Sequence, residues 1–145
     1  MKIREARSTD LDGLLQLYTQ LHENPVPKSK DSLLTLWDRI LRDKQHHIIV
    51  GVENGIIVSS CVIIIIPNLT HNQQPYGLVE NVITDEAHRR NGYASAVLNY
   101  AKELALSEHC YKIMLLTGSK EKHTLNFYKK SRYNSDDRTA FIQWL

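Results

Sequence analysis

The segment Glu80-Asn-Val-Ile-Thr-Asp-Glu-Ala-His-Arg-Arg-Asn-Gly-Tyr-Ala94 joins a predicted strand to a predicted helix. The strand is predicted over Tyr76 to Thr84, and the helix after Gly92 repeats small and apolar side chains at helical spacing. The first N–H groups of a helix lack partners within the helix and lie at the positive end of its dipole, so a turn of small residues there favours a phosphate group. We therefore expect this turn to bind the diphosphate of a cofactor, and the preceding strand to hold the reacting groups.

The flanking sequence predicts a mixed α/β domain around this segment. Apolar runs with the period of a strand cover residues 2–6, 46–52, 56–66, 76–84, 110–117 and 138–145. Amphipathic helices are predicted over residues 8–21, 31–41 and 119–131, and after Gly92. Asn54-Gly55 between two β-branched runs predicts a tight hairpin, and the strand–helix–strand order of residues 76–117 predicts a parallel pair of strands. No repeat or linker divides the chain, so residues 1–145 are predicted to form one domain.

Composition argues against several classes of protein. The formal net charge of +2 is too small to indicate a nucleic-acid or membrane partner. The two cysteines, Cys61 and Cys110, lie in apolar runs, which favours buried thiols over a disulfide. The N-terminal residues lack the apolar stretch of a signal peptide, and the run 62–66 is too short to cross a bilayer. The sequence therefore predicts a cytoplasmic protein.

The histidines do not indicate a metal site. His46 and His47 are neighbours on a predicted strand, so their side chains point to opposite faces and cannot hold one ion together. The other histidines fall in predicted loops or at helix ends, where solvated or capping roles are usual. We therefore expect no metal ion.

The run Arg89-Arg90-Asn91-Gly92-Tyr93-Ala94 resembles the (Arg/Gln)-x-x-Gly-x-(Gly/Ala) motif of the GNAT superfamily of N-acetyltransferases, which bind acetyl-coenzyme A. Glycine permits the tight turn, and the small side chain of Ala94 leaves the phosphate oxygens uncovered. The order of predicted elements resembles this family over nearly the whole chain, in particular its small bacterial members. The resemblance implies a mixed, mostly antiparallel sheet of about six to seven strands with about four helices, in which strands splay apart at the cofactor site.

The resemblance also implies where the cofactor binds. Backbone groups of Val82, Ile83 and Thr84 would contact the pantetheine arm of acetyl-coenzyme A. The pyrophosphate would be bound by residues of the turn and of the first helical turn, namely Arg89, Arg90, Asn91, Gly92, Tyr93, Ala94 and Ser95. Many family members carry a glycine after the last helix. Here Arg132 stands there, which requires this arginine to adopt the turn that glycine favours or the turn to differ.

The implied reaction needs a base and an acid. An amine attacks a thioester only as the free base, and a leaving thiolate is stabilised by protonation. Glu80 is the candidate base, directly or through water, because it precedes the proposed acyl site on the same strand. Tyr128 is the candidate acid, since the Phe127-Tyr128 pair matches an aromatic–tyrosine pair of the family. The resemblance implies the Val82 N–H as the oxyanion donor.

The candidate residues also have structural interpretations. Glu80 could instead form an ion pair across the sheet, and Tyr128 could be a core tyrosine. Strand alternation predicts Glu80, Val82 and Thr84 on one face, with Asn81 and Ile83 on the other. Asn81 would orient a water, bind substrate or only occupy an exposed face, and these alternatives stay open.

The sequence thus predicts an enzyme that transfers the acetyl group of acetyl-coenzyme A to a primary amine by direct attack through a tetrahedral intermediate. The region of His22 and Glu23 often lines the acceptor pocket in this family, so these residues are candidates for substrate contact. Polar residues at 71–76 favour a small polar acceptor. The alternatives are a non-catalytic module that binds acyl-coenzyme A as a sensor or partner, and an N-acetyltransferase for peptides or proteins. Residues 140–145 would suit strand pairing across a homodimer.

Overall fold

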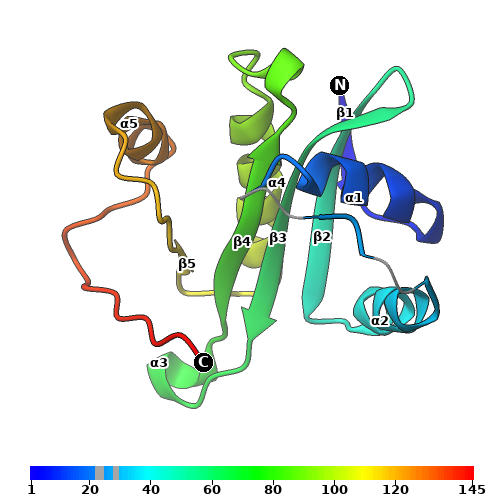
Figure 1. Ribbon diagram of the computed structural model, residues 1–145. Coiled ribbons are helices and arrows are strands. Elements are labelled where there is room, and N and C mark those ends of the chain that lie inside the picture. Colours follow the sequence, from blue (N-terminus) through cyan, green and yellow to red (C-terminus); the bar gives the residue numbers. More distant parts are fainter. Residues whose placement is uncertain (22–24, 28–29) are drawn as a thin grey trace.

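Figure 1 shows the computed structural model of the chain, which describes residues 1–21, 25–27 and 30–145. In that part of the chain, five strands form one sheet in the order β1-β2-β3-β4-β5. Their bounds are Lys2–Glu5 (β1), His46–Glu53 (β2), Ile56–Ile66 (β3), Tyr76–Thr84 (β4) and Ile113–Leu115 (β5). Neighbouring strands are antiparallel except β4 and β5, which are parallel, as the strand–helix–strand order predicted.

Helices cover both faces of the sheet (Figure 1). The helices α1 (Leu11–Tyr18) and α2 (Lys30–Arg42) lie on one face, and α4 (Tyr93–Ser107) lies on the other. We call these the α1 face and the α4 face. The remaining elements are the 3-10 turns η1 (Ser8–Asp10) and η2 (Glu86–His88), the short α3 (Thr70–Gln73) and the last helix, α5 (Lys122–Lys130).

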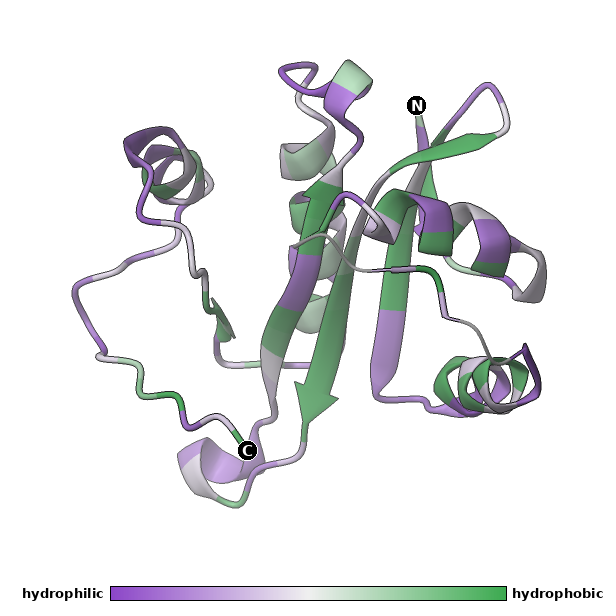
Figure 2. Ribbon diagram, in the orientation of Figure 1, coloured by the Kyte–Doolittle hydropathy of each residue, from purple (hydrophilic) through white to green (hydrophobic). Residues whose placement is uncertain are grey.

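Alternation along β2 and β3 divides the apolar side chains between two cores. Ile48 and Val50 pack with α1 and α2, whereas Ile49 and Ile63 pack with α4. Both faces of these central strands are therefore buried, which explains why their sequences are continuous β-branched runs. Figure 2 shows the same pattern, with the central strands among the most hydrophobic parts of the ribbon.

The strand β4 contains a bulge at Asn81. Its pairing with β3 shifts between Ser60 and Val62, so that two residues of β4 lie opposite Cys61. Asn81 has a φ of 50°, in the left-handed region. An extra residue in one strand reverses the faces of the side chains that follow it.

This bulge makes the predicted alternation of β4 wrong. Val82 packs with the α4-face core, and Ile83 packs with the α1-face core. Glu80 lies opposite a β3 residue of the α1-face core, and the side chain of Asn81 approaches Tyr18 of α1. Glu80, Asn81 and Ile83 therefore share the α1 face.

The sheet has fewer strands than predicted. Among the described residues it has five rather than about six to seven, because residues 138–145 have no strand partner. The strand predicted over 110–117 forms only over Ile113–Leu115, and the helix predicted over 119–131 forms over Lys122–Lys130. The strand-like sequence of the last residues is thus not paired with any strand among the described residues.

Candidate active site

The strands β4 and β5 separate halfway along β4. Their pairing covers only residues 77–79 of β4 and Ile113–Leu115. From residue 80 to residue 84, β4 has no partner strand on this side within the described part of the chain. Strand N–H and C=O groups that lack a neighbouring strand are available to a ligand. This opening is the splay expected from the sequence, and it fits an extended ligand that carries amides, such as a pantetheine arm.

The turn between β4 and α4 ends at Gly92, the residue before the first helical turn. Gly92 has a φ of 77°, and no side chain caps the start of the helix. A side chain in this conformation would cost roughly 1–2 kcal/mol, although a Cβ built at Gly92 would meet no atom within 4 Å. The glycine is therefore required by the backbone turn. The uncapped first turn, with Tyr93, Ala94 and Ser95, leaves N–H groups at the positive end of α4, where an anion is favoured.

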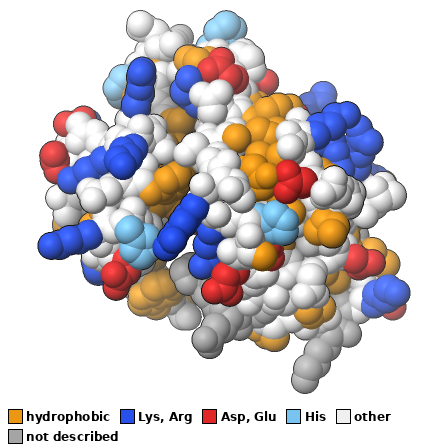
Figure 3. Space-filling model, turned by 90° about the horizontal axis from the view of Figure 1, so that it is seen from above, with side chains coloured by type: hydrophobic (Ala, Val, Ile, Leu, Met, Phe, Trp, Pro, Cys, Tyr) orange, Lys and Arg blue, Asp and Glu red, His pale blue; other side chains and the backbone are white. Residues whose placement is uncertain are grey.

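Arg89, Arg90 and Asn91 precede this glycine on the exposed part of the turn. Arg89 Nε donates to the carbonyl oxygen of Thr84 at 3.2 Å, and Asn91 Nδ2 donates to that of His88 at 3.2 Å. Arg90 has a φ of 66°, and its guanidinium has no hydrogen bond or ion pair with the described residues. Figure 3 shows several Lys and Arg side chains on the face that holds the turn. Two positively charged side chains, those of Arg89 and Arg90, therefore precede the uncapped start of α4.

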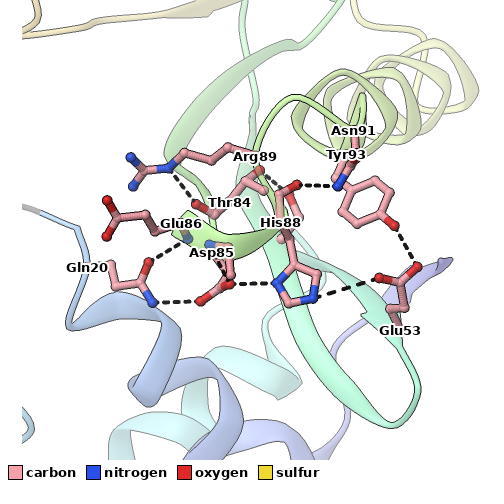
Figure 4. A network of polar contacts seen from close by, with 11 residues as sticks. Gln20, Glu53, Thr84, Asp85, Glu86, His88, Arg89, Asn91 and Tyr93 are labelled. Atoms are coloured by element: carbon pink, nitrogen blue, oxygen red, sulfur yellow. Dashed lines mark hydrogen bonds and ion pairs between the residues drawn. The ribbon is translucent and has the colours of Figure 1, made fainter.

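A polar network holds this turn in place (Figure 4). His88 Nδ1 lies 2.6 Å from Asp85 Oδ1, and His88 Nε2 lies 3.9 Å from Glu53 Oε2. The hydroxyl of Tyr93 donates to Glu53 Oε1 at 2.6 Å. The side-chain amide of Gln20 donates to Asp85 Oδ2 at 2.7 Å, and its oxygen accepts from the backbone N–H of Glu86 at 2.9 Å. The turn and the start of α4 are thereby tied to the end of β2 and to the residues that follow α1.

The network also shifts the ionisation of its members. The hydrogen bond from Tyr93 holds the pKa of the Glu53 carboxyl below its usual range, and the same bond raises the pKa of Tyr93. The hydrogen bond with His88, followed by that from Gln20, lowers the pKa of Asp85. Both carboxylates therefore stay ionised at neutral pH and continue to accept these hydrogen bonds.

The α1 face beside the opening presents Glu80, Asn81 and Tyr18. Glu80 is half-buried, and its carboxylate forms no hydrogen bond or ion pair with the described residues. The hydroxyl of Tyr18 is buried near the side chains of Ser60 and Asn81, yet it has no well-aligned hydrogen bond there. Burial raises the pKa of Tyr18 to about 12. A free carboxylate and a protonated phenol thus lie on the same side of the sheet.

Tyr128 lies on the α4 face of the sheet. It extends from α5 onto the α4-face core, where its ring packs against Phe127 and Tyr133 with centroid separations of 5.0 and 6.1 Å. Burial, with a smaller contribution from Cys61, raises the pKa of Tyr128. The phenol therefore keeps its proton at neutral pH, as a proton donor must.

The structure brings the predicted cofactor residues to one region. Val82, Ile83 and Thr84 follow the point at which β4 leaves β5, and residues 89–95 form the turn and the start of α4. Glu80 and Tyr128 are associated with opposite faces of the sheet, on either side of the β4–β5 opening. His22 and Glu23 lie outside the described residues, so their substrate contacts stay predictions.

Sequence reasoning missed the residues that brace the turn and the buried phenol of Tyr18. Gln20 and Asp85 are 65 positions apart, so no local pattern could have joined them. Helical spacing places Tyr18 on the apolar face of residues 8–21, which by itself predicts packing and no further role.

The described ranges were also searched for metal-binding groups and for membrane-spanning helices. No group of three or more His, Cys, Asp or Glu residues there is placed to hold a metal ion. Nor does any helix in those ranges combine the length and apolar character needed to span a bilayer.

Comparison with known proteins identifies the family. The model of the Acetyltransferase (GNAT) family matches residues 11–132. A curated glucosamine 6-phosphate N-acetyltransferase from Trypanosoma brucei brucei is 30% identical over 142 residues, which cover 95% of this chain and 92% of that protein.

Solved structures agree with this assignment. One from Agrobacterium tumefaciens strain C58, assigned to the acetyltransferases, is 33% identical with a TM-score of 0.91 and covers 99% of this chain and 100% of that one. Glucosamine-6-phosphate N-acetyltransferase from Arabidopsis thaliana, at 23% identity and a TM-score of 0.83, shares the fold over 99% of this chain and 97% of its own. The chain therefore belongs to the acetyltransferase (GNAT) family and is an N-acetyltransferase.

Proposed function

We propose that this enzyme transfers the acetyl group of acetyl-coenzyme A to the primary amine of a small polar acceptor. One observation carries the proposal. The strand that separates from β5 after Val79 leads through Arg89 and Arg90 directly into the uncapped start of α4. A ligand with an amide-bearing arm followed by a diphosphate has its parts in the same order. Acetyl-coenzyme A has both parts and supplies the reactive thioester.

The residues present fit the two parts of this ligand. The side chain of Ile83 is buried in the α1-face core, so only its backbone is available to the pantetheine arm. The backbone groups of Val82 and Thr84 would contact the same arm. The diphosphate would be bound by the first-turn N–H groups of α4 and by the side chains of Arg89, Arg90 and Asn91. Charge-assisted bonds of this kind contribute about 1.5–3 kcal/mol each.

The two proton-transfer candidates suit opposite sides of the opening. Glu80 faces the α1 side, where it would accept a proton from the acceptor ammonium, directly or through water. Tyr128 lies on the other side and would donate its proton to the leaving sulfur. The Val82 N–H would donate to the oxygen that becomes negatively charged.

Glucosamine 6-phosphate is the first acceptor to test. The curated relative at 30% identity is named for this substrate, and it is a small polar primary amine. Asn81 is exposed on the α1 face and offers an amide to a hydroxyl-rich acceptor. His22 and Glu23 remain candidates for further contacts.

The test is amine-dependent thiol release from acetyl-coenzyme A. The panel comprises glucosamine 6-phosphate, glucosamine, an aminoalkylphosphonate, an aminoglycoside and a peptide with a free N-terminus. We expect turnover with a small polar amine. Coenzyme A binding without turnover on any amine would instead indicate the sensor module, and turnover restricted to the peptide would indicate a peptide N-acetyltransferase.

Two substitutions test the catalytic assignments. We expect Glu80→Gln to lower kcat by roughly 100-fold or more, because general acid–base catalysis contributes about 10²–10⁴. Tyr128→Phe should lower kcat by roughly tenfold or more for the same reason. Neither change should alter the Kd of acetyl-coenzyme A by more than about threefold. Glu86→Gln and Tyr100→Phe are matched controls, and full activity of Glu80→Gln would remove Glu80 from the mechanism.

A further inference from the structure

The hydroxyl of Tyr18 is a buried polar group without a hydrogen bond among the described residues. Tyr18 is the last residue of α1, and its ring packs on the α1-face core. A hydroxyl in such a place is costly to leave unpaired. Its polar neighbours are the side chains of Ser60 on β3 and Asn81 at the β4 bulge. The phenol thus lies where α1, β3 and the bulge of β4 meet.

Ser60 restricts the direction in which the Tyr18 hydroxyl can donate. Ser60 is fully buried, and its own hydroxyl donates to the carbonyl oxygen of Ile49 at 2.9 Å. A serine hydroxyl has one hydrogen, so toward Tyr18 the Ser60 oxygen can only accept. Tyr18 also has one hydrogen, and the buried Ser60 oxygen is the better acceptor for it, because the exposed Asn81 can bond to water instead.

This direction also decides how the amide of Asn81 can bond. When the Tyr18 hydrogen points to Ser60, the phenol oxygen can only accept, and Nδ2 is the only donor of the Asn81 side chain. The order is then Asn81 Nδ2, Tyr18 hydroxyl, Ser60 hydroxyl and Ile49 carbonyl, each donating to the next. Hydrogen bonds that run in one direction strengthen one another. The Asn81 oxygen is left pointing away from the core.

We propose that Tyr18 is a positioning residue, which holds the Asn81 amide with Nδ2 turned inward and Oδ1 turned toward the amine of the acceptor. Tyr18 is not aligned with either neighbour in the structure, so these bonds require its hydroxyl and the exposed Asn81 side chain to rotate. The bulge places Asn81 on the same face as Glu80, the candidate base. The inference rests on the proposed function, because it gives Asn81 a role in binding the amine.

This arrangement suits a primary amine. After giving one proton to Glu80, a primary amine keeps two N–H bonds, and one of them can donate to Asn81 Oδ1. The amide is uncharged, so it would hold the nitrogen without favouring the ammonium form, as a second carboxylate would. An amide turned the other way would present its own N–H groups to those of the amine and would repel them.

Steady-state kinetics with the acetylated amine tests the positioning role. Tyr18→Phe frees the Asn81 amide to turn, so we expect kcat/KM for the amine to fall about three- to tenfold, the contribution of one hydrogen bond. Ser60→Ala should have a similar effect although the phenol remains, because the Tyr18 hydrogen then turns to Asn81 Oδ1. Neither change should alter the Kd of acetyl-coenzyme A by more than about twofold. Tyr100→Phe is the control.

Asn81→Asp separates positioning from a general structural effect. Aspartate tolerates the positive φ of the bulge, and both of its terminal side-chain atoms are oxygens, so its orientation no longer matters. In this background we expect Tyr18→Phe to lower kcat/KM by less than about twofold, compared on the pH-independent plateau. An equal loss in both backgrounds, or no loss from Tyr18→Phe in the original chain, would overturn the proposal.

NMR of the Asn81 side chain distinguishes failure of this inference from failure of the proposed function. We expect one Nδ2 proton to exchange slowly with solvent and to show an Overhauser contact with the Tyr18 ring, and this protection to be lost in Tyr18→Phe. If the protection is present but no amine is acetylated, the orientation of Asn81 stands and the proposed function fails. If amines are acetylated but both Nδ2 protons exchange equally fast, the inference fails and the proposed function stands.

Discussion

Arg132 lies just beyond the last turn of α5 in the left-handed conformation, with a φ of 68°. Its N–H donates to the carbonyl oxygen of Lys129, and the N–H of Tyr133 donates to that of Tyr128. These two bonds form a Schellman motif, whose left-handed position is usually a glycine. The arginine therefore adopts the left-handed conformation that glycine favours at this turn.

Replacing this arginine by glycine should stabilise the protein. A non-glycine residue in the left-handed region costs roughly 1–2 kcal/mol, part of which is offset by the greater freedom of glycine in the unfolded chain. We expect Arg132→Gly to raise the free energy of unfolding by about 1 kcal/mol, measured by urea denaturation. Arg132→Ala keeps the strain and serves as the control. A glycine variant no more stable than the alanine variant would show that the turn carries no strain.

Tyr18 should make the protein sensitive to alkaline pH. Because burial raises its pKa to about 12, its stabilising contribution is complete below the unfolded-state pKa, about 10. This contribution is lost as the pH rises through the folded-state value, by about 3 kcal/mol in all. Tyr18→Phe should keep its stability near pH 7 and lose less between pH 10 and 12, measured by urea denaturation at each pH. Parallel stability curves for the two proteins would contradict this assignment.

At the scale of elements, the β4–α4 turn depends on contacts from two distant parts of the chain. Glu53 at the end of β2 accepts the hydrogen bond of Tyr93, and Gln20 beyond α1 binds the backbone and side chain of the turn. A site held by such contacts keeps its N–H groups aligned before the ligand arrives, which lowers the cost of ordering on binding.

Loosening this network should weaken acetyl-coenzyme A binding more than catalysis. Tyr93→Phe removes only the hydroxyl that donates to Glu53. We expect the KM for acetyl-coenzyme A to rise about three- to tenfold, corresponding to the roughly 1 kcal/mol of one hydrogen bond, while kcat changes by less than about twofold. Tyr100→Phe, on the same helix, is the control. Equal losses in kcat and in binding would show that the network acts on the chemistry instead.

The elements themselves were largely predictable because their signals are local. Asn54-Gly55 forms the predicted hairpin, and Gly92 begins the predicted helix. No local sequence pattern predicted the bulge at Asn81, because an asparagine in a strand does not by itself indicate a positive φ. The missed bulge put Asn81 on the wrong face and so hid its approach to Tyr18.

At the scale of the whole molecule, the candidate catalytic residues belong to the two different faces of the sheet. The α1 face carries Glu80 and Asn81, the α4 face carries Tyr128, and the opening between β4 and β5 lies between them. In the proposed reaction the amine therefore approaches from one side, and the sulfur leaves toward the other.

The number of strands in the sheet could not be predicted from local sequence patterns, because strand pairing depends on the whole molecule. The last residues have the composition and alternation of a strand, but a strand exists only where an edge is available to pair with it. Alternation predicts only a tendency to form a strand, and the position of residues 138–145 relative to β5 depends on the whole chain.

In the proposed function, the β4–β5 opening and the start of α4 bind acetyl-coenzyme A as one continuous site. Calorimetric titration with coenzyme A and with pantetheine, which lacks the diphosphate and nucleotide, tests it most directly. We predict that coenzyme A binds at least about 100-fold more tightly than pantetheine, given roughly 1.5–3 kcal/mol for each charge-assisted contact. Gly92→Ala should reduce this ratio about tenfold, whereas Gly55→Ala, which imposes the same strain in the β2–β3 hairpin, should leave it unchanged. Equal affinities for the two ligands, or a ratio unaffected by Gly92→Ala, would contradict the account.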